Sequence, residues 1–193
     1  KHSGMLLLSK LLNTDPEGYE TLEHPVQKKI IEIINNLSGR NILEFPFGVD
    51  GCGVPAFSAP IKVWAKAFAS FADSKGLSEE LKKGKELISN AIYNEPLLIA
   101  GERRICTAIA KDLGDRITPK MGAEAVYCCS LNDTGLGLVL KCRDGSRRAV
   151  EFALGKIFLL LNYKISKDLK KYFDPNIYNL SGKKIGLKEA RLN

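Results

Sequence analysis

The spacing of apolar residues predicts amphipathic helices in the first half of the chain. The clearest one lies at residues 24–39, HPVQKKIIEIINNLSG, where five apolar residues share one helical face: Val26, Ile30, Ile33, Ile34 and Leu37. Pro25 suits a first helical position because an N–H there would have no helical partner, and Gly39 is typical of a helix end. His24 is therefore interpreted as a residue of the helix start rather than as a metal ligand.

Three further helices are expected before residue 115. Pro60 opens the first, and Ser78 has a side chain suited to cap the second. Apolar residues recur at helical spacing after both positions. A shorter helix follows Gly101 and ends before Gly114.

The pattern changes to alternating, β-rich composition near residue 123. Residues 123–131 and 136–142 predict two strands joined by a turn at 132–135, which together form a β-hairpin. A helix is expected at about residues 147–163, and an edge strand near 185–187. Helices in one block, then strands, then a helix indicate an α+β fold rather than an alternating α/β fold.

Length and composition indicate one globular domain over residues 1–193. The chain has 29 Lys and Arg against 22 Asp and Glu, which gives 29 − 22 = +7, and 45% of its residues are hydrophobic. The most apolar run, 149–161, is interrupted by Glu151 and Lys156. It is shorter than the roughly 20 apolar residues that cross a bilayer, so no membrane partner is expected.

Cysteine usage and the distribution of charge bear on the compartment and the partners. The five cysteines are odd in number and follow no disulfide spacing, which favours a reducing compartment, and we expect a cytoplasmic protein. The excess lysines are scattered among acidic and apolar residues. That pattern is typical of a solvated surface, so no nucleic-acid partner is expected.

The segment at residues 45–60, FPFGVDGCGVPAFSAP, carries the most informative chemistry. Four Gly or Pro residues lie from Gly48 to Pro55, which predicts an ordered loop without a helix or a regular strand. Asp50 and Cys52 are two residues apart, a spacing that places both side chains on one side of an extended segment. A thiol beside a carboxylate can bind a soft or borderline metal, act as a nucleophile, or be a small buried residue.

GVDGCGVP resembles the signature of the rhizobial-type L-asparaginases, the asparaginase II family. Other segments resemble further family blocks in the same order along the chain: KHSGML (1–6), HPVQ (24–27), EPLLIAG (95–101), KMGAEAVY (120–127), LKCRDGSRRA (140–149) and NLSGKKIG (179–186). The ordered set covers nearly all 193 residues, and only GVDGCGVP is specific by itself.

The resemblance implies a serine β-lactamase/glutaminase-like fold and hydrolysis of L-asparagine to L-aspartate and ammonia. It implies a serine nucleophile activated by a lysine three residues later. It also implies a zinc site in which Lys1 and Cys52 are ligands and Asp50 is the adjacent carboxylate. A further cysteine ligand of that site matches a position three residues before Lys1, and the family serines also precede Lys1.

Three residues are expected to face the substrate on the same grounds: His2, Lys120 and Glu124. An amino acid substrate carries an ammonium and a carboxylate, which opposite charges on Lys120 and Glu124 would match, although a plain surface ion pair is an equal alternative. His2 lines the site or is frayed at the chain end.

The chain departs from the family pattern at Ala125, where the family has Gly, and at Cys106, where it more often has Asp. A homodimer is implied as well.

The chain is therefore expected to be the C-terminal portion of an asparaginase-like enzyme, inactive without the preceding segment. The alternative is a non-catalytic folded fragment that serves as a partner-binding assembly module. A basic nucleic-acid-binding protein is a distant third reading, which a steep salt dependence of DNA binding would support.

Overall fold

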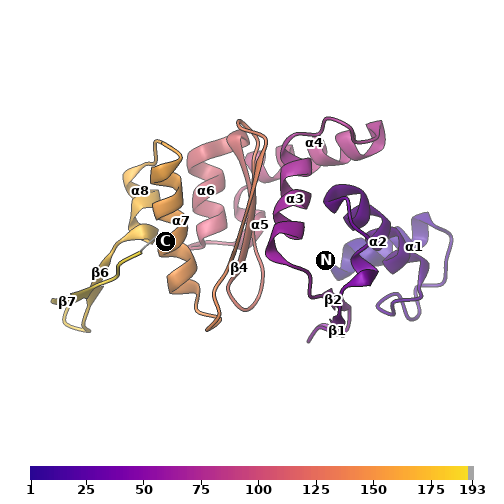
Figure 1. Ribbon diagram of the computed structural model, residues 1–193, viewed down its shortest axis with the longest axis horizontal. Helices are drawn as coiled ribbons and strands as arrows, with labels where there is room; N and C mark the ends of the chain where they lie inside the picture. The colour runs from indigo at the N-terminus through magenta and orange to yellow at the C-terminus, as the bar shows by residue number, and fades with distance from the viewer. Residues whose placement is uncertain (191–193) are drawn as a thin grey trace.

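The computed structural model describes residues 1–190 (Figure 1). Its α-helices are α1 (His2–Leu11), α2 (Pro25–Ser38), α3 (Ile61–Ala72), α4 (Glu79–Asn94), α5 (Leu97–Ala100), α6 (Ile105–Leu113), α7 (Arg147–Leu160) and α8 (Lys167–Lys170). Its 3-10 helices are η1 (Ile42–Glu44), η2 (Gly114–Arg116) and η3 (Lys171–Phe173). Its strands are β1 (Phe47–Val49), β2 (Pro55–Phe57), β3 (Ile117–Met121), β4 (Val126–Leu131), β5 (Leu136–Lys141), β6 (Asn176–Tyr178) and β7 (Lys184–Leu187). The mixed content confirms the α+β class.

The predicted helix starts are confirmed where local side-chain chemistry defines them. The Val26 N–H donates to His24 Nδ1 at 3.1 Å, and His24 Nε2 lies 2.8 Å from the Asp15 carbonyl oxygen. His24 is therefore the cap of α2, as expected, with Pro25 as the first helical residue. Gly39 ends α2 with a left-handed φ of 66°. At α4, Ser78 Oγ accepts a hydrogen bond from the Leu81 N–H at 3.3 Å.

A three-stranded antiparallel sheet in the order β3-β4-β5 forms the centre of the molecule. The hairpin of β4 and β5 is confirmed, with Leu131 paired to Leu136 next to the turn. Strand β3, which contains Pro119, was not predicted from the sequence. Proline lacks a backbone N–H, but β3 is an edge strand and can dispense with a donor on its outer side.

Helices cover both faces of this sheet (Figure 1). Helix α3 packs on β4 and β5 from one side, while α6 and α7 pack on the other. The main hydrophobic core lies on the second side, where residues such as Ile109, Tyr127, Leu154 and Phe158 are fully excluded from solvent. No helix within residues 1–190 combines the length and apolar character needed to cross a membrane.

Helix α3 lies unusually close to β5 because position 137 has no side chain. A Cβ atom on Gly137 would lie 2.0 Å from the Ala65 carbonyl oxygen and 2.4 Å from the Ala69 nitrogen, both in the α3 backbone. A side-chain bond fixes the same contact, since Ser130 Oγ on β4 donates to the Phe68 carbonyl oxygen at 2.7 Å. The sheet therefore sets the position of α3 and of the segments attached to it.

A smaller apolar cluster connects α3 to the N-terminal helices. Ile31 from α2, Ile42 from η1 and Val63 from α3 are buried together, and Phe57 of β2 packs against them. This cluster places the β1–β2 segment at the lower end of α3, close to α1 and α2 (Figure 1).

The prediction that residues 45–60 form a loop without a regular strand was wrong in part. Strands β1 and β2 form a short antiparallel hairpin, with Phe47 opposite Phe57 and Val49 opposite Pro55. Glycine and proline weaken strands but do not exclude three-residue ones, and the Phe47 and Phe57 rings pack with centroids 5.9 Å apart. The predicted edge strand near residue 185 is confirmed as β7, which pairs with β6.

Asp133, in the β4–β5 turn, connects the sheet to the segment that follows α7. Its carboxylate accepts hydrogen bonds from the Tyr163 hydroxyl at 2.6 Å and from Arg116 Nε at 2.9 Å. The Arg116 guanidinium also lies 4.8 Å from the centre of the Tyr163 ring. Burial raises the pKa of Asp133, but the bonds from Tyr163 and Arg116 outweigh it, and the net pKa is lowered.

This network predicts an acid-sensitive contribution to stability. Because the folded-state pKa of Asp133 is lowered, its contribution is complete above the unfolded-state pKa and is lost as the pH falls through the folded-state pKa. Asp133→Asn is expected to cost about 1–2 kcal/mol at neutral pH and to flatten the decline in stability on the acid side. Urea unfolding across the acid range measures both effects. An unchanged pH profile in Asp133→Asn would contradict this role.

Candidate functional site

The β1–β2 hairpin presents Asp50 and Cys52 at its tip. The Asp50 N–H donates to the Val54 carbonyl oxygen at 2.9 Å, and the Gly53 N–H donates to the Asp50 carbonyl oxygen at 2.8 Å. Gly53 adopts a φ of 90°, which glycine takes without steric cost. Val54 is buried, whereas Asp50 and Cys52 are exposed. The two backbone hydrogen bonds therefore fix the turn, and the Asp50 and Cys52 side chains point towards solvent.

The first residue of the chain completes this group. Lys1 Nζ donates to Cys52 Sγ at 2.9 Å, and Cys52 Sγ donates to Asp50 Oδ2 at 2.9 Å. The distance from Lys1 Nζ to Asp50 Oδ2 is 3.9 Å. An amine, a thiol and a carboxylate thus meet at one point, although about 50 residues of sequence separate Lys1 from the other two. We refer to these three residues as the Lys1 cluster.

The Lys1 cluster is polar and open to solvent. The Lys1 and Asp50 side chains are each 50% exposed. The pKa of Asp50 is lowered, chiefly by the hydrogen bond from the Cys52 thiol and next by the Gly51 backbone N–H. Asp50 is therefore a carboxylate at neutral pH, available to a cation beside the thiol.

Helix α1 is held in place next to the cluster by Tyr19. His2 Nδ1 lies 2.8 Å from the Tyr19 hydroxyl oxygen, and the two rings pack edge to face at 5.9 Å. The Gln27 side chain, which is buried, donates to the Tyr19 carbonyl oxygen at 2.8 Å. His2 is thus partly buried and bonded, and the alternative that it is frayed was wrong. Tyr19 was not predicted from the sequence, whereas Gln27 belongs to the HPVQ segment that resembles a family block.

Lys120 and Glu124 lie elsewhere in the molecule. Lys120 is on β3 and its Nζ donates to the Met121 carbonyl oxygen at 2.6 Å. Glu124 lies in the turn before β4, with a left-handed φ of 50°. Both are exposed, and no ion pair joins them within residues 1–190. The structure brings neither of them to the Lys1 cluster, because α3 lies between the sheet and the part that holds the N-terminus and the β1–β2 hairpin (Figure 1).

The remaining cysteines are core residues or lie apart from the cluster. Cys128 and Cys129 are buried on β4, as expected for structural thiols. Burial raises the pKa of Cys128 to about 11 and that of Cys129 further. Cys106 is also buried and accepts a hydrogen bond from the Met121 N–H, and burial raises the pKa of its thiol. Cys142 is partly exposed.

The donor set of the Lys1 cluster suits zinc in kind. Zinc binds thiolate sulfur, nitrogen and carboxylate oxygen, and protein sites supply at least three such ligands. Each ligand must be deprotonated, so an incoming cation would displace the protons that now bridge Lys1, Cys52 and Asp50. Among residues 1–190, no group of three or more His, Cys, Asp or Glu side chains is placed to hold a metal. With Asp50 as the adjacent carboxylate, the Lys1 amine and the Cys52 thiol are two of the three or more ligands that a zinc site needs.

Comparison with known proteins defines the family. The L-asparaginase II family model matches residues 1–190. The chain belongs to the L-asparaginase II family. A search of curated proteins finds no match to the chain. The match of an L-asparaginase II model to nearly the whole length supports the ordered blocks that the sequence analysis identified, and it identifies the chain as part of an amidohydrolase family.

Proposed function

We propose that the protein takes part in the hydrolysis of L-asparagine to L-aspartate and ammonia, and that the Lys1 cluster forms one wall of the site. Family membership supports the reaction class. The observation that carries the site is that Cys52 lies within hydrogen-bonding distance of both Lys1 and Asp50, although Lys1 is distant from the other two residues in the sequence.

In this proposal Lys1 and Cys52 hold a zinc ion and Asp50 supports it. A bound zinc ion would polarise or structure the pocket beside the reacting amide. The protein residues provide the rest of the environment. The Asp50 carboxylate offers a negative charge next to the cluster, and the hairpin turn keeps that charge at a fixed distance from the Cys52 sulfur.

His2 is proposed to contact the polar groups of the substrate. Its ring follows Lys1 directly, and the Tyr19 hydroxyl fixes its orientation through Nδ1. The other ring nitrogen, Nε2, is then available for a substrate oxygen or nitrogen. Lys120 and Glu124 remain proposed substrate contacts by resemblance alone, and their separation from the Lys1 cluster gives them a lower priority for mutation.

The proposed nucleophile is a serine from sequence that precedes Lys1 in family members, arranged in a Ser-x-x-Lys element and within the serine β-lactamase-like fold. Attack by the serine oxygen on the side-chain amide carbon would release ammonia and leave an acyl-enzyme, which water then hydrolyses to L-aspartate. The contribution of the present chain is the pocket wall rather than the attacking atom.

Ammonia release from L-asparagine tests this proposal. The 193-residue chain alone is expected to give no turnover, whereas the same chain joined to the N-terminal segment of a family member is expected to release ammonia. Asp50→Asn in the joined protein is expected to lower kcat/KM by about 10- to 100-fold, with Asp73→Asn as a matched exposed control. Turnover by the 193-residue chain would contradict the placement of the nucleophile. An inactive joined protein that folds would contradict the proposed reaction.

A homodimer is also proposed. It rests on the family resemblance and on exposed leucines of α1, of which Leu7 is 59% and Leu11 is 71% exposed. Light scattering during size-exclusion chromatography measures the mass. A monomer at all concentrations would contradict this part of the proposal.

A further inference from the structure

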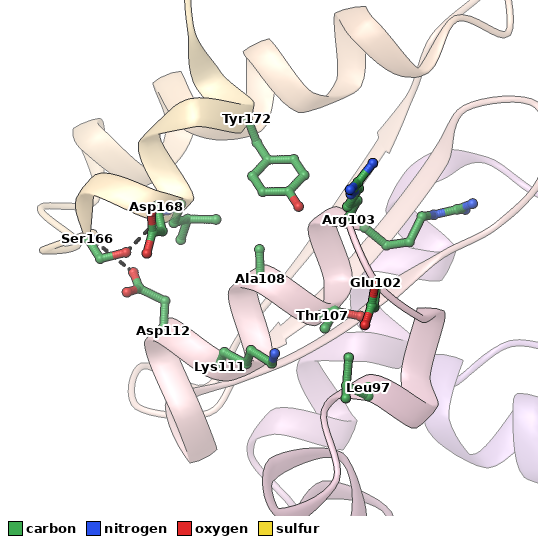
Figure 2. A pocket seen from close by; sticks show the side chains of 12 residues that line it. Leu97, Glu102, Arg103, Thr107, Ala108, Lys111, Asp112, Ser166, Asp168 and Tyr172 are labelled. Atoms are coloured by element: carbon green, nitrogen blue, oxygen red, sulfur yellow. Dashed lines mark hydrogen bonds between the residues drawn. The ribbon is translucent and has the colours of Figure 1, made fainter.

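A cavity of about 590 Å³ lies between α6 and the segment formed by α8 and η3. Leu97, Ala108 and Leu169 give it apolar surface, and Tyr172 contributes an aromatic ring. In Figure 2 the Tyr172 ring points from η3 towards α6, with Arg103 at the same end of the space. The helices α6 and α8 that line the cavity lie on the opposite side of the sheet from the N-terminus and the β1–β2 hairpin (Figure 1), so the cavity is separate from the proposed amidohydrolase site.

Three cationic side chains line the cavity without partners. Arg103, Arg104 and Lys111 make no hydrogen bond and no ion pair through their side chains in the part of the chain that the structure describes. Arg103 and Lys111 are exposed, and Arg104 is partly buried. Lys171, by contrast, is paired with Asp168 next to the cavity. The three cations therefore keep their donors available for a ligand.

The acidic residues of the cavity are largely occupied. Asp112 accepts a hydrogen bond from the Ser166 N–H at 2.9 Å, and Asp168 accepts one from Lys171 Nζ at 2.5 Å. Both acids lie at the α8 end of the cavity, whereas Arg103 lies at the Tyr172 end (Figure 2). Glu102 is the remaining carboxylate, drawn beside Thr107 in the same view. Within residues 1–190, three unpaired cations therefore line the cavity against one unpaired carboxylate, that of Glu102.

The backbone before α6 has an unusual conformation at Arg103. Arg103 adopts a left-handed φ of 54°, which residues with a side chain rarely take. Such strain persists where the surrounding structure enforces it, often at binding sites. Arg104 is the N-cap residue of α6 and provides no side-chain cap, so the first-turn N–H groups add to the positive end of the helix.

We propose that this cavity binds a small organic anion through a carboxylate or phosphate group. The guanidinium groups of Arg103 and Arg104 match the oxygens of either group, and Lys111 adds a point charge. The Tyr172 hydroxyl supplies a further donor, and its ring and Ala108 cover the apolar body of the ligand. The size of the cavity exceeds the needs of a free inorganic ion and suits a compact metabolite.

Calorimetric titration of the 193-residue chain with succinate and with inorganic phosphate at low ionic strength tests the site, with sodium chloride as the reference. Binding of succinate would identify a carboxylate site, and binding of phosphate a phosphate site. Arg104→Gln is expected to raise the Kd for the bound anion by about tenfold or more. Lys111→Gln changes an exposed position and is expected to raise the same Kd severalfold. It therefore tests the site even if Arg104→Gln folds poorly.

Arg143→Gln is the matched control, because Arg143 is an exposed arginine outside the cavity. It removes the same charge and should leave anion binding unchanged. The proposal is overturned if neither anion binds more tightly than chloride, or if Arg143→Gln weakens binding as much as the cavity variants. These results do not involve asparagine turnover, so they are independent of the proposed amidohydrolase function.

Discussion

Gly137→Ala is expected to destabilise the protein by about 3 kcal/mol or more. The added methyl group would lie 2.0 Å from the Ala65 carbonyl oxygen, and the obstacle is helix backbone rather than a flexible side chain. Relief requires α3 to move away from β5, which would strain the bond from Ser130 to the Phe68 carbonyl oxygen. For a chain of this size, the loss corresponds to a fall of roughly 6–12 °C in Tm.

Gly84→Ala is the matched control for this prediction. Gly84 lies within α4, and a Cβ atom there would meet nothing within 4 Å. The same added methyl group should therefore stabilise the helix by about 0.5–1 kcal/mol. Thermal and urea unfolding of both variants measure the contrast. A Gly137→Ala variant as stable as the parent would show that α3 does not lie directly against β5.

Cys52→Ser is expected to raise the Kd for zinc by about 100-fold or more. Loss of residues that only support a zinc ligand costs about 10- to 100-fold in affinity, and direct removal of a thiolate ligand costs at least as much. The serine hydroxyl keeps the size of the side chain and its hydrogen bond to Asp50, but it is a poor zinc ligand at neutral pH. Competition with a chromophoric chelator measures the affinity.

Cys142→Ser serves as the control, because Cys142 is also free and partly exposed but does not belong to the Lys1 cluster. It should leave the Kd for zinc unchanged. Equal zinc affinity of Cys52→Ser and the parent would remove Cys52 from the metal site. A comparable loss in Cys142→Ser would show that zinc binds to cysteines in general.

Local signals explain which elements were predictable from the sequence. The start and end of α2 follow from His24, Pro25 and Gly39, each of which acts on the backbone beside it. Strand β3 was missed because Pro119 argues against a strand, and only its place at the sheet edge makes that residue acceptable. Strands β1 and β2 were missed because three-residue pairs depend on packing against α3 rather than on their own composition.

The candidate site was predictable only in part, because some of its contacts are local in the sequence and others form only when distant segments pack together. The glycine-flanked spacing indicated that Asp50 and Cys52 share a side, and the 2.9 Å contact confirms it. The position of Lys1 beside them was implied by resemblance, since no local pattern connects residues so far apart. Tyr19 and Gln27 were not foreseen, because their contacts form only once α1 and α2 pack together.

The absorption spectrum of the cobalt-loaded chain tests the role of the Lys1 cluster most directly. Cobalt(II) occupies zinc sites and gives an intense near-ultraviolet charge-transfer band when a thiolate binds it. The 193-residue chain is expected to show this band with one cobalt ion per chain, Cys142→Ser to retain it, and Cys52→Ser to lose it. A band of full intensity in Cys52→Ser, or no band in the parent chain loaded with cobalt, would contradict a metal site built on Cys52.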